Sequence, residues 1–285
     1  MNLNYNSASE LRAFLEKEGL GMQKKFGQNF LIDPNVKKKL IEALNIESEV
    51  KAGAEVWEIG PGLGAMTALL LENGFKVKAF EIDNGFIRML KQFFSNDKNF
   101  TLIEGDVLKT WHGQSEAPYL LGNLPYNIGA AFLADLIEKK RIFSRMVVTV
   151  QKEVALRMMA GAGSKDYSSF SVLCASVYDV KPIITIKASA FYPAPNVDSM
   201  GVLLRSKNAD PYPAVFYPLV RSLFASRRKT VKNNLSAFIG SREKCEVILQ
   251  ENALNGNERA ETLKLEVFLS LAKSIENMRL YNQEC

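Results

Sequence analysis

Histidine and cysteine are scarce in this sequence of 285 residues, which argues against several kinds of chemistry. The one histidine, His112, stands beside Trp111 in a stretch with no clear helical or strand pattern. The three cysteines, Cys174, Cys245 and Cys285, lack the paired spacing of a zinc site or a disulfide framework. Histidine-based triads and metal-dependent hydrolysis are therefore not expected, and no metal is predicted.

Long hydrophobic runs are also absent, since no apolar stretch approaches the roughly 20 residues that cross a bilayer. The first residues, MNLNYNSASELRAF, lack the basic and then apolar regions of a signal peptide. The net charge of +5 allows a polyanionic partner but does not require one. We therefore expect a cytoplasmic protein in a reducing compartment, without membrane contact. The sequence does not give the oligomeric state, and a monomer is the prediction.

Short apolar strands alternate with helical patterns through most of the chain. This alternation predicts an α/β fold with a parallel, doubly wound sheet, in which ligands sit at the carboxyl ends of the strands. Asp33 is a predicted helix N-cap followed by Pro34 at the first helical position. The predicted strands are 54–60, 76–83, 100–106, 119–123, 145–151, 181–189 and 200–206.

The pattern changes after about residue 207. A proline-rich junction, NADPYPA, precedes segments that are helical in pattern without clear strands, namely 215–240, 244–254 and 263–278. We therefore predict two domains: residues 1–207 as a ligand-binding α/β domain with an N-terminal extension, and residues 208–285 as a smaller helical domain.

Glycines cluster in EIGPGLGAMT, where Gly60, Gly62 and Gly64 fall between the first predicted strand of the sheet and its helix. Glycine tolerates positive φ and allows a ligand to approach the backbone, while the following helix N-terminus favours an anionic group. The spacing Gly60-x-Gly62-x-x-Ala65 nearly matches the dinucleotide fingerprint. A ligand-binding turn is predicted, with a dinucleotide site and a plain glycine-rich turn as alternatives.

Acidic residues end the next two predicted strands. Glu81 ends AFEID, where a carboxylate can accept two hydrogen bonds from ribose hydroxyls. Asp106 ends EGDV, where a carboxylate is placed to accept from the exocyclic amine of an adenine. Either acid alone is more often a solvated loop residue, but two at successive strand ends favour a nucleoside pocket. NAD and S-adenosylmethionine both suit such a pocket.

The stretch GNLPY follows the fourth strand and suits transfer of a methyl group to an adenine N6. That nitrogen is a poor nucleophile, because its lone pair is delocalised into the ring. The Asn123 Oδ1 and the Leu124 carbonyl can accept its two hydrogens and draw it toward tetrahedral geometry. Pro125 would fix the turn and Tyr126 would stack on the base. The alternative is a plain loop with a structural tyrosine.

A basic segment, RSLFASRRKTVKNN, lies in the predicted helical domain. It contains Arg221, Arg227, Arg228, Lys229 and Lys232 within twelve residues. The excess of one charge and the interleaved asparagines favour contacts with nucleic-acid phosphates. A solvated helix face is the alternative interpretation.

Eight stretches, taken together, resemble the ribosomal RNA adenine N6,N6-dimethyltransferase family, in its small-subunit branch. The resemblance implies a Rossmann-like class I methyltransferase sheet with S-adenosyl-L-methionine as the cofactor. It also implies an enzyme that dimethylates N6 of two adjacent adenosines in a hairpin loop near the 3′ end of 16S rRNA, during biogenesis of the small ribosomal subunit. The stretches are KKFGQNFLID, EIGPGLGAMT, EID, EGDVL, GNLPYNI, FYPAPNVDS, FASRRKTVKNNL and RAETLKLEVFLSLA.

The same resemblance assigns residues to the cofactor. In the family, the loop that contains GQNFL closes over the cofactor, which implies that Asn29 and Leu31 contact S-adenosylmethionine. Gly60 is implied to lie against its methionine part, Glu81 on its ribose and Asp106 on its adenine.

Further residues are assigned to the target base. Asn123 is implied to join the cofactor and target sites, and Phe191 of FYPAP to sandwich the base opposite Tyr126; a core aromatic is the alternative for Phe191. Leu124 replaces a proline of the broader amino-methyltransferase pattern, which is usual in this branch.

Arg227, Arg228 and Lys229 are the predicted RNA-binding residues.

Other functions remain open at this point. A relative that methylates an adenine of large-subunit rRNA is disfavoured by FASRRKTVKNNL and by RAETL. A non-enzymatic assembly checkpoint or transcription factor on the same fold is disfavoured by the complete Asn-x-Pro-Tyr and Glu/Asp set. A dehydrogenase is the most distant alternative.

Overall fold

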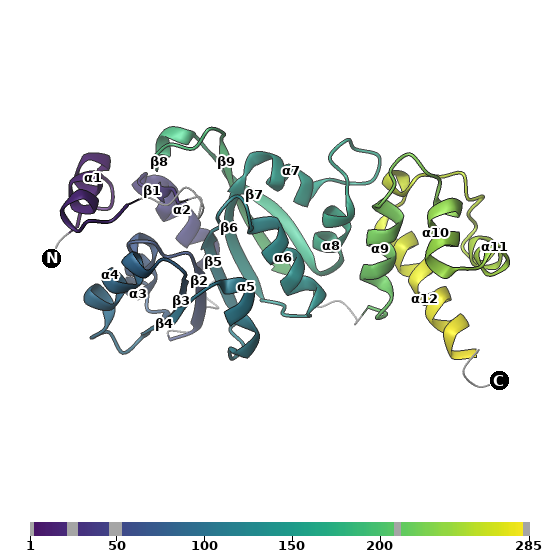
Figure 1. The fold of residues 1–285 in the computed structure, drawn as a ribbon, viewed down its shortest axis with the longest axis horizontal. Helices are drawn as coiled ribbons and strands as arrows, with labels where there is room; N and C mark the ends of the chain where they lie inside the picture. Colours follow the sequence, from purple (N-terminus) through teal and green to yellow (C-terminus); the bar gives the residue numbers. More distant parts are fainter. Residues whose placement is uncertain (1–2, 22–27, 46–52, 208–211, 282–285) are drawn as a thin grey trace. The chain divides into compact units, whose positions relative to one another are not determined.

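The computed structural model describes residues 3–21, 28–45, 53–207 and 212–281 (Figure 1). The chain divides into two compact units. We call Met1–Ala155 with Val180–Ser206 the sheet unit, and Leu156–Asp179 with Lys207–Cys285 the helical unit. One border lies after Ser206, one residue before the predicted boundary after residue 207. The segment Leu156–Asp179 differs, since the sequence pattern puts it in the first domain but it groups with the C-terminal helices.

A seven-stranded sheet with the order β4-β3-β2-β5-β6-β9-β7 forms the centre of the sheet unit (Figure 1). The pairs from β4 to β6 are parallel, as predicted. The pair β6·β9 is antiparallel, with Arg145 opposite Arg205, a direction that the sequence pattern did not specify. The strands are β2 (Glu55–Ile59), β3 (Lys76–Glu81), β4 (Phe100–Glu104), β5 (Tyr119–Asn123), β6 (Arg145–Gln151), β7 (Tyr178–Ile186) and β9 (Ser199–Ser206).

Helices follow most of these strands and confirm the predicted alternation. The helices are α1 (Ala8–Lys17), α2 (Pro34–Asn45), α3 (Ala65–Glu72), α4 (Asn84–Phe94), α5 (Val107–Thr110), α6 (Gly129–Glu138) and α7 (Lys152–Met159). Asp33 caps α2 as predicted, since its Oδ1 accepts from the backbone N–H groups of Asn35 and Val36. Two short strands, β1 (Phe30–Leu31) and β8 (Phe191–Tyr192), pair antiparallel in a separate two-stranded sheet.

The core of the sheet unit includes its central strands. Val56, Leu121 and Val147, from β2, β5 and β6, are at most 3% exposed and pack with residues of α2 and α3. Strands that are covered on both faces read as continuous apolar runs, which is the pattern of YLLG and RMVVTV. Because these buried strands are also parallel, their carboxyl ends meet at one edge of the sheet.

The helical unit contains α8 (Ser169–Val177), α9 (Phe216–Phe224), α10 (Val231–Ile239), α11 (Arg242–Glu251) and α12 (Leu265–Tyr281). The rings of Phe224 and Phe268 stack at 5.8 Å between centroids and join α9 to α12. The segment predicted as continuously helical over 215–240 is divided at residues 225–230, where Thr230 caps α10. No described helix is both long and apolar enough to span a bilayer.

Candidate active site

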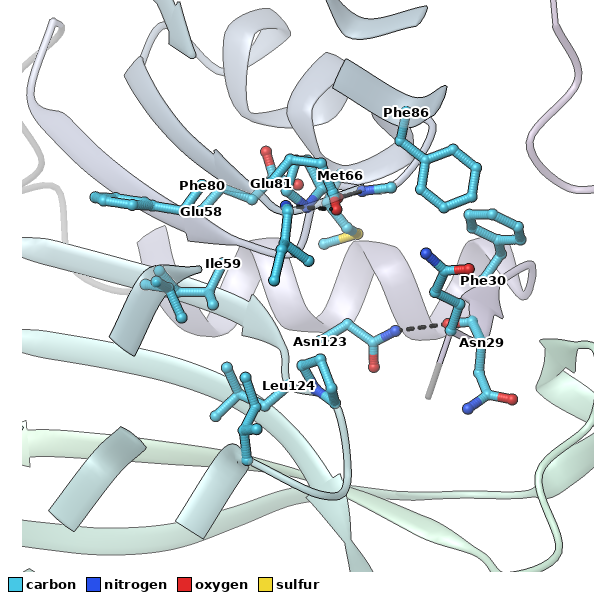
Figure 2. Close-up of a pocket in the computed structure, with 18 of the residues that line it drawn as sticks. Asn29, Phe30, Glu58, Ile59, Met66, Phe80, Glu81, Phe86, Asn123 and Leu124 are labelled. Atoms are coloured by element: carbon cyan, nitrogen blue, oxygen red, sulfur yellow. Dashed lines mark hydrogen bonds between the residues drawn. The ribbon is translucent and has the colours of Figure 1, made fainter. Parts of the chain in front are cut away.

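A cavity of about 310 Å³ lies at the carboxyl ends of β2, β3 and β5 and beside the turn after β4 (Figure 2). This is where parallel α/β sheets bind ligands, and the volume is within the range of small-molecule sites. Its walls include most of the predicted site residues, which the fold brings together from distant parts of the chain. They are Asn29, Leu31, Gly60, Glu81, Asp106, Asn123, Leu124 and Tyr126.

The glycine turn, Gly60–Gly64, forms one wall and requires its glycines. Gly60, Gly62 and Gly64 have φ of 68°, 59° and 89°, values that side-chain-bearing residues rarely adopt. A Cβ on Gly62 would lie 2.8 Å from the Phe30 ring. The Gly62 N–H donates to Glu81 Oε2 at 3.0 Å, which ties the turn to the end of β3.

Glu81 is buried, and its carboxylate already accepts three backbone hydrogen bonds. Oε1 accepts from Ile82 and Asp83, each at 2.9 Å, and Oε2 accepts from Gly62. A carboxylate has about four acceptor positions, so one position on Oε2 remains for a ligand hydroxyl. Burial raises the pKa of Glu81 to about 7, although its backbone hydrogen bonds oppose this rise.

Glu58 is a second buried acid in the cavity wall, and the sequence pattern did not single it out. It is 2% exposed and its Oε2 accepts from Thr67 Oγ1 at 2.6 Å. Burial, with a smaller contribution from the nearby Glu81 charge, raises the pKa of Glu58 to about 8. Its position two residues before the first glycine of EIGPG was the available signal.

Asp106 lines the cavity and also caps the short helix α5. Its Oδ1 accepts from the Leu108 N–H at 3.0 Å. The other carboxylate oxygen, Oδ2, is left for a ligand at the end of β4. The side chain therefore combines a local structural role with the geometry that the predicted binding role needs.

Asn123 ends β5 and connects two walls of the cavity. Its Nδ2 donates to the Asn29 carbonyl at 2.8 Å, and its Oδ1 points away from that carbonyl (Figure 2). The adjacent Phe30 ring meets Phe86 edge-on, with 5.5 Å between centroids. The segment 28–31 is thus fixed to the strand end as well as to α4. The rest of the predicted loop, residues 22–27, lies outside the described residues.

The segment 124–126 continues the wall beyond Asn123. Leu124 is 2% exposed and fills the space above Gly122, where an added Cβ would lie 2.7 Å from Leu124 Cδ2. The Tyr126 hydroxyl shares a 2.6 Å hydrogen bond with Ser199 Oγ, at the start of β9. Burial raises the pKa of Tyr126, so this hydroxyl stays protonated. Ser199 was missed from the sequence, because nothing in the pattern links β9 to position 126.

Phe191 lies in the core, as in the alternative interpretation of this residue. It pairs with Leu31 through β1 and β8, is 3% exposed and packs with residues of α2. It is not part of the cavity wall, whereas Leu31 is buried in the same core and does line the cavity. The apolar neighbours hold Phe191 in place, and stacking on a base would require the FYP segment to shift.

The predicted basic residues lie in the helical unit, between α9 and α10. Arg227 Nε pairs with Glu261 Oε2 at 3.1 Å, and its Nη2 donates to the Lys165 carbonyl at 3.4 Å. Arg228 and Lys229 are exposed. All three side chains are exposed, and Arg227 differs from Arg228 and Lys229 in its ion pair with Glu261. Among the described residues, no group of His, Cys, Asp and Glu is arranged to hold a metal.

The sheet order and the position of the cavity define the class I methyltransferase fold. The structure is similar to that of a dimethyladenosine transferase from Plasmodium falciparum, with a TM-score of 0.73 and 26% identity, over 86% of this chain and 96% of that chain. It also resembles the 23S rRNA methyltransferase ErmE, with a TM-score of 0.62 and 21% identity over 86% of this chain and 99% of that chain; this likeness concerns the fold alone.

Sequence comparison identifies the family. The family model described as ribosomal RNA adenine dimethylase matches residues 19–277. The chain is 47% identical over 289 residues to the ribosomal RNA small subunit methyltransferase A of Treponema denticola, a match that covers 96% of this chain and 97% of that protein. The chain belongs to the ribosomal RNA adenine dimethylase family.

Proposed function

We propose that this protein uses S-adenosyl-L-methionine to dimethylate N6 of two adjacent adenosines near the 3′ end of 16S rRNA, in maturation of the small ribosomal subunit. The observation that carries the proposal is the convergence of Asn123, Leu124 and Tyr126 with Glu81 and Asp106 around one cavity. Family membership and the identity to a small-subunit methyltransferase support the same substrate. A cytoplasmic location and a monomeric state are part of this proposal.

The described residues fit this cofactor. The glycine turn leaves space beside Gly60 for the methionine part, where an added Cβ would meet only the Asn123 carbonyl oxygen, at 3.9 Å. Glu81 Oε2 retains one acceptor position for a ribose hydroxyl, and Asp106 Oδ2 is available to an adenine amine. We assign Asn29 and Leu31 to the wall that covers the bound cofactor. When bound, the cofactor supplies an electrophilic methyl group.

For the target adenosine, the Asn123 Oδ1 and the Leu124 carbonyl accept the two N6 hydrogens. These acceptors would draw the lone pair away from the ring and make N6 nucleophilic toward the methyl group that the cofactor would supply. The acidic aminium product would then release its proton to water. The fixed geometry of the strand end supplies positioning and electrostatic stabilisation, and no strong base is required. Tyr126 stacks on the base, with its hydroxyl held by Ser199. For Phe191 to stack on the other face of the base, residues 191–193 must shift, because the Phe191 ring is buried in the core.

The RNA would be held by the helical unit. Reaching N6 requires an unstacked base, so recognition depends on RNA shape and on phosphate contacts more than on groove reading. Arg228 and Lys229 are exposed cations that suit phosphates, and Arg227 is a third exposed cation, whose charge is already paired with Glu261. This arrangement suits a ribosomal subunit, whose surface is a dense array of phosphates.

The test is to incubate the protein with S-adenosylmethionine and small subunits that lack the modification, and then map the modified nucleosides by mass spectrometry. We expect N6,N6-dimethyladenosine at two adjacent positions near the 3′ end of 16S rRNA. Methylation of large-subunit rRNA alone would establish the resistance-type activity instead. Tight subunit binding without any methyl transfer would establish a non-enzymatic checkpoint.

A further inference from the structure

The N-terminal segment Leu3–Leu20 lies against the glycine turn. The Tyr5 hydroxyl donates a hydrogen bond to the Leu63 carbonyl at 3.0 Å, across 58 positions of sequence. Leu63 belongs to the turn and is 1% exposed. Tyr5 is not part of the cavity wall, so it contacts the turn from outside the cavity.

The Tyr5 contact is itself held in place. The Tyr5 carbonyl accepts from Lys37 Nζ at 3.2 Å, and Lys37, on α2, is 3% exposed. Burial, together with the charge of Glu58, raises the pKa of Tyr5 to about 12, so its hydroxyl remains a donor throughout the physiological pH range. The residue therefore spans the distance between α2 and the glycine turn.

Helix α1 anchors the rest of the segment. Leu11, Phe14 and Leu15 are buried in one cluster with Leu63 of the turn and Phe86 of α4, and the cavity-wall residue at position 30 packs against this cluster. At the end of α1, the Arg88 Nη2 donates to the Glu18 carbonyl at 3.1 Å. One hydrophobic cluster thus joins the N-terminal segment to two parts of the cavity.

The turn needs such external support. Three glycines at positive φ give it a large conformational freedom to lose on ordering. Toward β3 it is held by the bonds of the Gly60 N–H to the Phe80 carbonyl and of the Gly62 N–H to Glu81. On the side of Leu63, the Tyr5 hydroxyl supplies a further bond from outside the main sheet.

We propose that Tyr5 is a positioning residue for the cofactor, acting through the Leu63 carbonyl, and that Leu3–Leu20 is part of the cofactor site without touching its ligand. The inference rests on the proposed function, which makes S-adenosylmethionine the ligand of the cavity. An N-terminal helix that merely stabilised the fold would raise the melting temperature without changing ligand affinity.

The experiment compares two substitutions that remove the same kind of hydrogen bond. Tyr5→Phe removes the hydroxyl that donates to Leu63, and Tyr167→Phe removes one that donates to the Leu263 carbonyl, also at 3.0 Å, within the helical unit. Affinity for S-adenosylmethionine is measured by titration calorimetry on the full chain, beside the melting temperature. We expect Tyr5→Phe to weaken binding about five- to tenfold and Tyr167→Phe to leave it unchanged.

A further variant tests whether the hydroxyl or the order of the whole segment matters. Asn4→Ala removes the 2.9 Å bond from Asn4 Nδ2 to Glu10 Oε1 and the 3.0 Å bond that Asn4 Oδ1 accepts from the Asn6 N–H, and it leaves the Tyr5 hydroxyl intact. We expect this variant to bind S-adenosylmethionine with near-normal affinity. A loss equal to that of Tyr5→Phe would overturn the specific role of the hydroxyl.

In turnover, Tyr5→Phe is expected to raise KM for S-adenosylmethionine with little change in kcat, because the hydroxyl does not contact the reacting atoms. Equal affinities in Tyr5→Phe and the wild type would overturn the positioning role, even if the melting temperature fell. A wild-type protein that binds no S-adenosylmethionine would overturn the proposed function itself, and this inference with it.

Discussion

The cavity of the sheet unit and the basic turn of the helical unit, residues 225–230 between α9 and α10, are built in opposite ways. In the cavity, Glu58, Glu81 and Leu124 are at most 5% exposed, and the two acids accept hydrogen bonds from fixed partners. In the basic turn, Arg228 and Lys229 are exposed. A buried polar group is strongly affected by the loss of one partner, whereas an exposed cation contributes modestly and is screened by salt.

This contrast suits the two proposed tasks, methyl transfer in the cavity and RNA binding at the basic residues. Chemistry at one nitrogen requires atoms held within fractions of an ångström, and only packed, hydrogen-bonded groups supply that. Holding a phosphate-rich surface requires charge more than geometry, and several cations share the work. A single substitution in the cavity should therefore reduce activity or stability strongly. Substitutions in the basic turn should weaken RNA binding less, and in a way that depends on salt.

The largest effect is expected from Asn123→Ala. The substitution removes the Oδ1 acceptor for the target amine and the 2.8 Å bond to the Asn29 carbonyl. Methyl transfer should fall by about a thousandfold or more, as for the loss of a charge-stabilising group. Incorporation of tritiated methyl groups into unmethylated small subunits measures it, with subunit binding as the control that should stay largely intact. Near-normal incorporation would disprove the assigned mechanism.

The next effect is on stability and depends on pH. The pKa of Glu58 rises from 4.5 to about 8 on folding, so the folded chain holds the proton more tightly than the unfolded chain. The resulting stabilisation is complete below the unfolded pKa of 4.5 and is lost as the pH rises through about 8. Between pH 4.5 and about 8, the free energy of unfolding of the wild type should therefore fall by on the order of 4 kcal/mol relative to that of Glu58→Gln.

Urea unfolding of both proteins at about pH 5, 6.5 and 8, spanning the titration of this group, provides the measurement. The Glu58→Gln variant keeps an acceptor for the Thr67 hydroxyl but cannot titrate, which makes the difference between the two proteins specific to this position. A difference that stays constant across the three pH values would show that Glu58 is ionised in the fold.

A smaller effect is expected from the double substitution of Arg228→Ala and Lys229→Ala. Affinity for the small subunit should fall about 10- to 100-fold at low salt, with a salt dependence shallower by about one to two counterions. Arg242→Ala with Lys244→Ala removes the same charge from exposed positions of α11 and serves as the control. If both pairs weaken binding equally, net charge and not this turn determines the interaction.

The smallest effect is expected from Ser199→Ala. Removing the 2.6 Å bond to the Tyr126 hydroxyl leaves the ring in place but less constrained, so kcat should fall about fivefold. Ser176→Ala is the matched control, because its buried hydroxyl donates to the Leu173 carbonyl within the helical unit. An unchanged kcat in Ser199→Ala would show that Ser199 does not contribute to catalysis through Tyr126.

Much of the fold could be predicted from local patterns. Strand ends such as Glu81 and Asn123 were found because parallel strands gather their carboxyl ends at one edge, a rule that needs only the order of elements. The antiparallel β9 was not predicted, since an apolar strand reads the same in either direction. The segment Leu156–Asp179 groups with the C-terminal helices for a reason that is equally invisible in the sequence: a helical pattern carries no record of which core it joins.

Site residues could be predicted where the residue type alone indicates a role. They were missed where the role depends on a contact with a residue that is distant in the sequence. A glycine or a strand-end acid indicates a special backbone or a charge. Ser199 and Glu58 become significant only through Tyr126 and Thr67, contacts that arise from tertiary packing. Arg227 illustrates the converse, because an arginine that reads as one of three equivalent cations pairs with an acid far along the chain.

The contact between Gly62 and Phe30 links two positions that are far apart in the chain. A methyl group at position 62 would lie 2.8 Å from the Phe30 ring, and a φ of 59° would strain any side chain there. A smaller residue at position 30 would relieve the first obstacle but not the second. Position 62 is therefore restricted to glycine both by its backbone conformation and by the Phe30 ring, so the width of the cavity at this wall is set by the side chain at position 30.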